Sequence, residues 1–343
     1  MSEIAVVILN WNTRHQLETF LPGIISHSQD EGVEVVVADN GSDDDSVAFM
    51  KAHYPDIRLI EFDKNYGFTG GYNRALAQIE ARYYMLLNSD VEVTANWLGP
   101  MKEYLDEHPE AAACMPRMKS YHQRDYFEYA GAAGGFIDRF GYPFCRGRIL
   151  DTVEKDEGQY EVATDIFWAT GACMLVRADL FHQMGGFDDD FFAHMEEIDL
   201  CWRLKNNGHT IRYTPQSLVY HVGGGTLPNN NPFKLYLNYR NNLFLLYKNL
   251  PDKKFLPVMA TRLLLDVISS LAFILKGNPA GFGSVFKAHR HFFKSLSGLK
   301  EKRKNLPHSP CEYPREVYPK SILMSYFIGK KRRFCQLNFC VNP

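Results

Sequence analysis

Short apolar segments alternate with helical patterns through the first third of the chain, and this alternation is the strongest constraint on its fold. Five segments rich in Val, Ile and Leu are expected to be strands: residues 3–9, 33–38, 57–61, 83–88 and 111–116. The patterns between them favour helices near residues 14–27, 45–53, 70–81 and 95–107. Strand–helix alternation at this spacing is typical of a parallel, doubly wound sheet, so we predict an α/β fold.

Polar residues follow each of the first four expected strands. They are Asn10-Trp11-Asn12, Asp39-Asn40-Gly41-Ser42, Asn65-Tyr66-Gly67-Phe68 and Asn88-Ser89-Asp90. A single cluster of this kind is more often a helix cap or an Asx-turn than a binding site. Because ligands of such sheets bind beyond the carboxyl ends of the strands, four clusters at one edge favour a site.

The expected site lacks the phosphate-binding loops of common nucleotide-binding folds. No dinucleotide fingerprint or Walker lysine motif occurs, and the glycines of GFTGGYN (67–73) follow the third strand at the wrong spacing. The crevice instead offers amides, hydroxyls and carboxylates, which would repel a phosphate unless a divalent cation lay between them. Asp90 is therefore a candidate ligand for Mg²⁺ or Mn²⁺, together with phosphate oxygens of a substrate.

The second half of the chain adds an acidic cluster and a histidine. Glu196, Glu197 and Asp199 fall in the first turn of an expected helix that ends near Gly208. The helix dipole favours anions there, and a carboxylate near a bound substrate can also serve as a general base. Glu196 and Glu197 point about 100° apart on a helix, so they cannot share one role. His221 ends another expected strand and is either a structural residue or a second metal ligand.

Seven motifs follow one another in a characteristic order. They are Asn-Trp-Asn, Asp-Asn-Gly-Ser, Asn-x-Gly-Phe-x-x-Gly-x-Asn, Leu-Asn-Ser-Asp, Gly-Gly-Phe-Asp, Glu-Glu-x-Asp-Leu-Cys-x-Arg and His-x-Gly-Gly. Over residues 3–250 the chain resembles the family 2 glycosyltransferases, and most closely the rhamnosyltransferase-like subgroup that builds bacterial surface polysaccharides. The resemblance implies a GT-A fold, which is Rossmann-like, with a helical C-terminal extension. It also implies an inverting, metal-dependent, non-processive transfer of one sugar from a nucleoside diphosphate donor, UDP- or dTDP-linked.

The resemblance also implies roles for individual residues. The positions that match the family's donor-binding motifs are Asn10, Asn12, Asp39, Asn65, Gly67, Asn73, Asn88 and Arg203. Asp90 matches the last residue of the family's Asp-x-Asp motif and His221 its later metal-binding histidine, so the implied cofactor is Mn²⁺ or Mg²⁺. Glu197 falls at the position of the base, with Asp199 as a second catalytic candidate.

Two departures from the family's pattern bear on these roles. Asn88 replaces the first aspartate of the metal motif, which lowers the negative charge and weakens the expected affinity for metal. Glu197 stands where aspartate is more usual and is one methylene longer. The assignment of the base therefore stays open between Glu197, Glu196 and Asp199.

Composition divides the chain into three parts. We expect residues 1–230 to be the catalytic domain, with an insertion of loops and short strands at 118–163. Residues 231–304 read as an amphipathic helical extension, and residues 305–343 as a basic, partly disordered tail. Residues 276–343 hold 14 Lys and Arg against 3 Asp and Glu, although the whole chain has a net charge of −2. Basic amphipathic helices lie on anionic membranes, so we expect peripheral contact with the inner leaflet, near a lipid-linked glycan acceptor.

The location is expected to be cytoplasmic. The seven cysteines form no Cys-x-x-Cys pair, which fits a reducing compartment, and the N-terminus reads directly into a strand without a signal peptide. The most apolar stretch, residues 263–275, is shorter than the roughly 20 residues of a spanning helix and contains Asp266. No motif supports nucleic acid as a partner of the basic tail.

Three alternative functions each require different sequence features. A processive polysaccharide synthase should carry a Gln-x-x-Arg-Trp motif and several spanning helices, and neither occurs in the sequence. A nucleotidyltransferase that makes the donor sugar should have a basic, Gly-rich loop after the first strand, where this chain has NWNTRHQ. A catalytically inactive nucleotide-binding or membrane-adaptor module is compatible with Asn88 in the metal motif.

Overall fold

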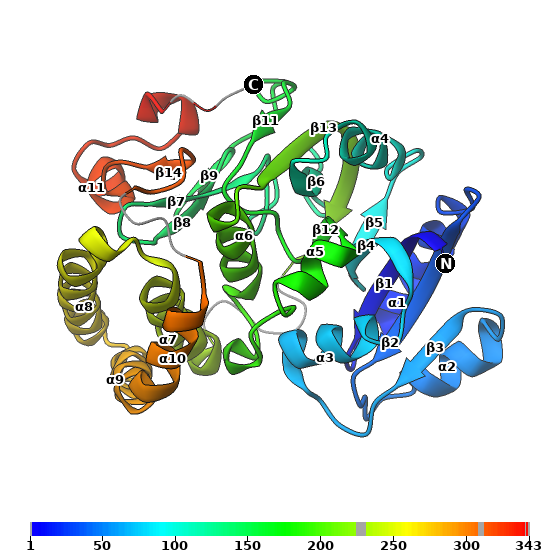
Figure 1. The fold of residues 1–343 in the computed structure, drawn as a ribbon, viewed down its shortest axis with the longest axis horizontal. Helices are drawn as coiled ribbons and strands as arrows, with labels where there is room; N and C mark the ends of the chain where they lie inside the picture. The colour runs from blue at the N-terminus through cyan, green and yellow to red at the C-terminus, as the bar shows by residue number, and fades with distance from the viewer. Residues whose placement is uncertain (1, 224–230, 308–311, 340, 342–343) are drawn as a thin grey trace.

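The computed structural model describes residues 2–223, 231–307, 312–339 and 341 (Figure 1). The strands of its large sheet are β1 (Ser2–Asn10), β2 (Val33–Asp39), β3 (Arg58–Glu61), β4 (Ala81–Asn88), β5 (Val91–Val93), β6 (Ala111–Ser120), β11 (Thr164–Asp165), β12 (Cys173–Arg177) and β13 (Thr210–His221). In the described chain their order is β11-β13-β6-β12-β4-β1-β2-β3, and β5 pairs with β13. All five strands predicted from the sequence are confirmed.

The helices that accompany this sheet also follow the predicted pattern. They are α1 (Arg14–Ser26), α2 (Ser46–His53), α3 (Gly67–Leu76), α4 (Gly99–Glu107), α5 (Ala178–Gln183) and α6 (Glu196–Asn206). The five strands predicted from the sequence run in one direction, as expected, but the sheet is mixed because β12 lies between β4 and β6 and runs antiparallel to both. The Cys-Met-Leu-Val run of β12 is buried on both faces like a parallel strand, so its composition carries no information about direction.

Strand register brings the predicted polar clusters to one level. β1 lies between β2 and β4 and is parallel to both, with Asn10 opposite Asp39 and Leu9 opposite Asn88. The apolar side chains of β1 and β4 are buried on both faces of the sheet, which fixes this register. The polar residues that follow these strands therefore emerge side by side at one edge.

Residues 118–163 contribute a second, smaller sheet. Its strands are β7 (Gly135–Asp138), β8 (Pro143–Cys145), β9 (Arg148–Ile149), β10 (Thr152–Val153) and β14 (Val317–Tyr318). β14 comes from the C-terminal segment and pairs in parallel with β7. The insertion and the end of the chain thus form one structural unit.

The C-terminal segment differs from the expected partly disordered tail. After β14 it forms α11 (Ile322–Phe327) and the 3₁₀ helix η2 (Phe334–Leu337), and Figure 1 shows α11 and β14 beside β7 of the insertion. The Phe334 ring is buried and lies 5.2 Å from the ring of Phe136 and 6.1 Å from that of Phe144. The apolar residues of this segment, such as Phe334, are separated by prolines and basic residues. Its composition therefore gave no sign of a packed structure.

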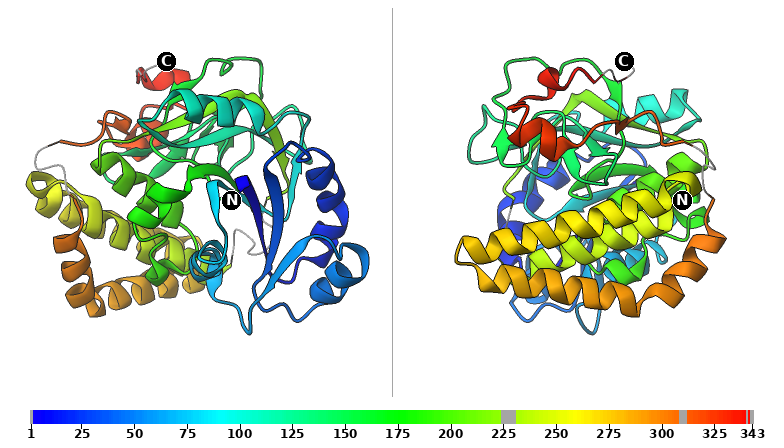
Figure 2. Two further views of the ribbon diagram at one scale, coloured as in Figure 1. Left: turned by 45° about the vertical axis from the view of Figure 1, so that its right-hand side comes forward. Right: turned by 90° about the vertical axis from the view of Figure 1, so that its left-hand side faces the viewer.

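Four helices form the extension between these parts. They are α7 (Pro232–Asn249), α8 (Asp252–Leu275), α9 (Pro279–Lys294) and α10 (Leu296–Asn305). They pack together at one side of the molecule, with α8 and α9 side by side on its outer face (Figure 2). Among the described residues, α8 is the one helix long and apolar enough to cross a membrane, and 28% of its most apolar window is buried in the protein.

Removal of the Phe334 ring tests whether the C-terminal segment is part of the folded core. Phe334→Ala should lower the free energy of unfolding by about 3–5 kcal/mol, the usual cost of deleting a buried phenylalanine. Urea denaturation of the full chain measures this change. Phe327→Ala, at a position 65% exposed on α11, is the control and should change the stability by less than about 0.5 kcal/mol. Equal effects of the two variants would contradict docking of the segment.

Candidate functional site

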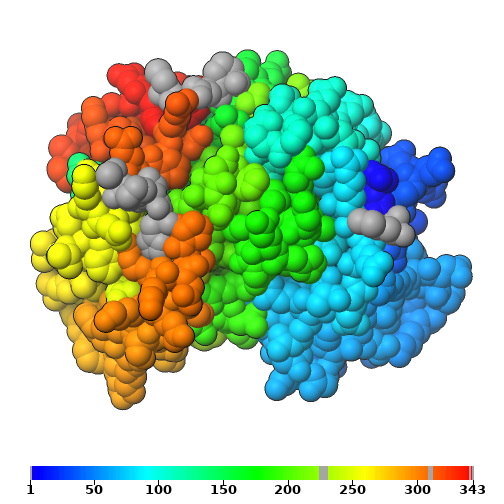
Figure 3. Space-filling model, in the orientation of Figure 1, coloured from blue at the N-terminus to red at the C-terminus, as the bar shows by residue number. Residues whose placement is uncertain are grey.

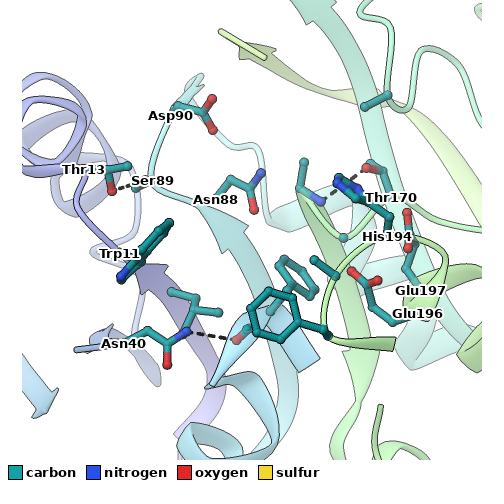
Figure 4. A pocket seen from close by; sticks show the side chains of 18 of the residues that line it. Trp11, Thr13, Asn40, Asn88, Ser89, Asp90, Thr170, His194, Glu196 and Glu197 are labelled. Carbon is teal, nitrogen blue, oxygen red and sulfur yellow. Dashed lines mark hydrogen bonds between the residues drawn. The ribbon is translucent and has the colours of Figure 1, made fainter. Parts of the chain in front are cut away.

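A cleft of about 440 Å³ opens at the carboxyl ends of β1, β2 and β4 (Figure 4). The wall formed by the strand ends is lined by Leu9, Trp11, Thr13, Asn40, Asn65, Gly67, Asn88, Ser89 and Asp90. The opposite wall and the rim are lined by Thr170, Gly171, Phe192, His194, Glu196, Glu197, His221, Phe233 and Lys234. All four polar clusters predicted from the strand ends contribute to this one cleft.

Asn10 and Asp39 form a hydrogen-bonded pair beneath the cleft. The Asn10 amide donates to Asp39 Oδ2 over 2.8 Å, and Thr13 Oγ1 donates to Asn10 Oδ1 over 2.6 Å. The carboxylate of Asp39 also accepts from the backbone and the hydroxyl of Ser42. Both side chains are buried and absent from the cleft lining, so they hold the strand ends in place. Asn12 has a φ of 53° and belongs to the turn that follows β1.

Asn65 and Gly67 line the cleft where the chain enters α3. Asn65 Oδ1 accepts from the backbone of Gly67 over 2.7 Å, and the Asn40 amide donates to the carbonyl of Gly67 over 2.9 Å. Gly67 has a φ of +73°, and a Cβ atom there would lie 2.5 Å from the ring of Phe192. Glycine is thus required for the loop around Phe192 to approach the sheet edge.

Asp90 and His221 meet at one end of the cleft. β13 pairs with β5, which follows β4 directly, and this pairing brings His221 Nε2 to 3.1 Å from Asp90 Oδ1. The other ring nitrogen, Nδ1, lies 3.4 Å from Glu128 Oε1 of the insertion. Burial favours the neutral ring, but the carboxylates of Glu128 and Asp90 outweigh it and raise the pKa of His221 to about 10.

The Asp90–His221 pair has the chemistry of a partial metal site. In the described parts of the chain, no three His, Cys, Asp or Glu side chains surround a common position that could hold an ion. One carboxylate and one imidazole do fit Mn²⁺ or Mg²⁺ when the remaining ligands are diphosphate oxygens and water. Asn88 lines the cleft beside Asp90 and can add only a neutral oxygen.

Two glutamates form an acidic wall on the other side of the cleft. Figure 4 shows Glu196 and Glu197 across from Asn88 and Asp90, at the start of α6. Oε2 of each glutamate has no hydrogen-bond partner within the described residues. Burial raises the pKa of Glu197 to about 7, and burial together with the charge of Glu197 raises the pKa of Glu196 well above its ordinary value. Unpaired carboxyl oxygens are costly to bury, so this wall is suited to receiving a proton from a bound hydroxyl.

His194 precedes the acidic wall and belongs to the same loop. His194 and Met195 both have positive φ, 70° and 73°, which turns the chain sharply into α6. Burial lowers the pKa of His194 to about 4, so its ring is neutral near pH 7. Its Nε2 also lacks a hydrogen-bond partner in the described structure. The wall thus presents a neutral imidazole beside two carboxyl groups.

Asp199 and Arg203 lie outside the cleft, on the opposite side of α6. Asp199 is fully buried and accepts from Arg203 Nε (2.8 Å), Lys248 Nζ (2.9 Å) and the Asn249 amide (2.8 Å). Two positions along a helix turn a side chain by about 200°, so Asp199 faces away from the cleft when Glu197 faces it. Neither Asp199, the second catalytic candidate, nor Arg203, expected to bind the donor, lines the cleft.

Asn73 is also displaced from the cleft that it was expected to line. Its amide donates to the carbonyl of Phe187 and to Asp189 Oδ1, both over 2.8 Å. It therefore fixes the Gly-Gly-Phe-Asp loop from α3. The motif runs from Asn65, before α3, to Asn73 in the second turn of that helix. Its first and last residues therefore contact different parts of the protein.

Sequence analysis assigned no individual role to Trp11, His194 and Lys234, which line the cleft, or to Glu128, which contacts the cleft residue His221. Trp11 stands inside the Asn-Trp-Asn cluster, so its place in that motif was an available signal. Glu128 comes from the irregular insertion, where no pattern distinguished it. His194 and Lys234 reach the cleft through long-range packing of α6 and α7, which local patterns do not encode.

Comparisons with known proteins show what the chain is similar to. The family model described as glycosyl transferase family 2 matches residues 5–185. The N-acetylglucosaminyl-diphospho-decaprenol L-rhamnosyltransferase of Mycobacterium tuberculosis is 28% identical over 236 residues, which cover 64% of this chain and 75% of that protein. The rhamnosyltransferase WbbL of Escherichia coli K12 is 26% identical over 231 residues, covering 64% and 83%.

Solved structures confirm the predicted GT-A fold. A fragment of S. aureus TarS in complex with UDP-GlcNAc superimposes with a TM-score of 0.57 at 15% identity, covering 88% of this chain and 83% of that one. GalNAc-T7 with UDP, GalNAc and Mn²⁺ also gives a TM-score of 0.57, at 13% identity, covering 74% and 49%. At these identities the likeness establishes the fold.

The raised pKa of Glu197 predicts a pH-dependent stability. Folding favours the protonated form, so this stabilisation is complete below about pH 4.5 and is lost as the pH rises through about 7. Glu197→Gln keeps a neutral side chain and should raise the melting temperature over wild type at pH 8 but not at about pH 4. Thermal unfolding across this range measures the difference. The exposed Glu103→Gln on α4 is the control, and a similar trend in both variants would contradict a special environment for Glu197.

Proposed function

The chain belongs to glycosyl transferase family 2, and from this premise we propose an inverting, divalent-metal-dependent, non-processive glycosyltransferase. The proposed reaction moves one sugar from a nucleoside diphosphate donor to a hydroxyl group of a lipid-linked glycan. One observation carries the proposal. The cleft holds Asp90 and His221, a carboxylate and an imidazole in contact, on one side and a glutamate of raised pKa, Glu197, on the other.

The donor nucleotide is proposed to lie along the strand ends. Trp11, Asn40, Asn65 and Asn88 line that wall and offer one aromatic surface and several amides. Asn10, Asn12 and Asp39 would act from beneath or beside the cleft as positioning residues, and Gly67 would allow the close approach of the opposite wall. In this proposal Asn73 and Arg203 shape the neighbouring loop and do not touch the donor.

The cofactor is proposed to be Mn²⁺ or Mg²⁺, held by Asp90 and His221. The chemistry that such an ion supplies when bound is neutralisation of the charge on the departing diphosphate. Lys234 at the rim adds a positive side chain to the same cleft. His221 must release its ring proton for this role, so the binding of metal and of protons should compete there.

Glu197 is proposed as the general base. Its pKa near 7 and its unpaired Oε2 suit removal of a proton from the acceptor hydroxyl at neutral pH. The acceptor oxygen forms a bond to the anomeric carbon, the bond from that carbon to the diphosphate breaks, and the proton passes to Glu197. A single displacement of this kind inverts the anomeric configuration. A glycosidase would instead place two carboxyl groups on either side of the scissile bond.

The acceptor class is supported by a relative. The printed name of the M. tuberculosis protein includes a decaprenol-linked diphosphate sugar and L-rhamnosyl transfer. A lipid-linked glycan acceptor is therefore proposed for this chain, with a UDP- or dTDP-linked donor. The proposed location is the cytoplasm, in peripheral contact with the inner face of the membrane.

A thermal-shift panel tests the proposed function. UDP, dTDP, GDP and CDP are each added with and without Mn²⁺ to the full chain. One diphosphate should raise the melting temperature in a metal-dependent way, since a ligand at a hundredfold excess over its Kd stabilises the folded state by about 2.7 kcal/mol. Asp90→Ala should abolish the metal-dependent part, whereas Asp125→Ala, an exposed residue of the insertion, should not.

Two results would overturn this function. The absence of a shift with every nucleotide would indicate an inactive module. In a parallel panel with UTP, dTTP, GTP and CTP, stabilisation by the triphosphates alone would indicate the nucleotidyltransferase alternative.

A further inference from the structure

The outward face of α8 has the polarity normally found inside a protein. Every exposed side chain from residue 256 to residue 275 is apolar: Leu256, Pro257, Ala260, Leu264, Val267, Ile268, Leu271, Ile274 and Leu275. The two charged residues within the same stretch, Arg262 and Asp266, are buried. A helix that faces water has the reverse arrangement.

The inward face of α8 is held by polar contacts. Arg262 Nε lies 2.8 Å from Asp266 Oδ1, and Arg262 also donates to Asn242 Oδ1 of α7 over 2.5 Å. The guanidinium of Arg262 stacks on the ring of Tyr142, and His289 of α9 lies 3.3 Å from Asp266 Oδ2. These buried ionic groups are paired and fix the rotation of α8. The apolar side chains therefore face outward as a consequence of specific packing.

The apolar face continues onto α9, beside α8. Phe282, Phe286 and Phe293 are exposed at spacings that place them on one side of α9. Figure 2 shows α8 and α9 running together across the outer surface, and α8 forms one margin of the molecule in Figure 3. An exposed apolar surface of this continuity marks an interaction site.

The charges around this face are predominantly positive. Between residues 252 and 305 the exposed basic side chains are Lys253, Lys254, Lys276, Lys287, Arg290, Lys294, Lys300 and Lys304. The exposed acidic side chains in the same range are Asp252 and Glu301. Basic residues beside an apolar helix face complement a membrane that contains anionic phospholipids. In a symmetric dimer across this face, the same basic residues would oppose one another.

We propose that the exposed apolar side chains of α8 and α9, from Leu256 to Phe293, form a docking surface that lies in the plane of an anionic phospholipid bilayer. The aliphatic side chains of α8 enter the acyl region, and the surrounding lysines and arginines meet the headgroups. α8 does not cross the bilayer, because spanning would expose Arg262 and Asp266 to hydrocarbon and break their contacts with α7 and α9. The inference rests on the proposed function in one respect, since that function supplies the lipid-linked acceptor.

The docking surface is joined to the rim of the cleft through α7. Ser284 of α9 donates to the carbonyl of Pro232, the first residue of α7, over 2.9 Å. The ring of Tyr236, one turn later, stacks on His291 of α9. The same first turn of α7 places Phe233 and Lys234 in the cleft lining. Docking therefore holds the rim of the cleft close to the lipid surface from which the acceptor arrives.

Vesicle sedimentation of the full chain tests the docking surface. The protein is mixed with vesicles of phosphatidylcholine alone or with phosphatidylglycerol, at low and at high salt. Binding should require the anionic lipid and weaken with salt, as expected for basic side chains at headgroups. The double variant Ile268→Glu, Leu271→Glu should bind the vesicles at least about tenfold more weakly than wild type, because two charges would enter the apolar region. Val162→Glu, an exposed apolar position on the insertion, should bind like wild type.

The other occupants of this face give distinct results. Failure to bind anionic vesicles, or equal binding by the double variant, would overturn the proposal. If the wild type does not bind vesicles and light scattering shows that it is a dimer, whereas the double variant is a monomer, the occupant of this face is a second copy of the chain. Resistance of the membrane-bound protein to alkaline carbonate would indicate a spanning α8. An unchanged nucleotide-induced thermal shift in the double variant would show that it is folded and separates this test from that of the proposed function.

Discussion

The register of three parallel strands is the constraint on which the rest of the structure depends. β1 pairs with β2 and with β4 so that Asn10 lies opposite Asp39, and Asn88 lies opposite the preceding residue, Leu9. A slip of one residue would reverse which face each side chain of a strand occupies, and burial on both faces of β1 and β4 resists it. The polar edge, and with it the cleft, follows directly from this alignment.

The second wall of the cleft depends on α7. The Asn241 amide donates to the carbonyls of Phe191, Ala193 and His194, over 2.9, 2.8 and 2.7 Å. Lys248 of the same helix pairs with the buried Asp199 of α6. These contacts hold the sharp turn that carries Glu196 and Glu197 into the cleft. The C-terminal extension is therefore part of the framework of the site, and the same helix connects it to the apolar surface of α8 and α9.

Local patterns were sufficient to predict one half of the site. Apolar runs followed by Asn, Asp and Ser identified the strand ends, and their meeting in one cleft follows from parallel pairing. The other half depends on contacts between segments far apart in sequence. Glu128 reaches His221 across 93 residues of chain, and the direction of β12 and the burial of Asp199 are set by neighbours that no local pattern specifies.

The C-terminal parts show the same limit in another form. In the sequence, Asp266 argued against a membrane-spanning helix in the apolar stretch of α8. In the structure this residue is buried and paired with Arg262, and the exposed face of the helix is apolar. The basic, proline-containing tail suggested disorder, whereas Phe334 anchors it to the insertion. In both cases the composition of the segment gave no information about which of its side chains the fold buries.

The central claim is that Glu197 accepts the proton of the acceptor hydroxyl in this cleft. The most direct measurement is the pH dependence of kcat/KM for wild type and Glu197→Gln, with the identified donor and a lipid-linked acceptor. The account predicts that wild-type kcat/KM falls as the pH drops below about 7, because the carboxyl becomes protonated. Glu197→Gln should lose about 10²–10⁴-fold and show no acid limb with that pKa. Wild-type rates in Glu197→Gln, with the acid limb unchanged, would contradict the account.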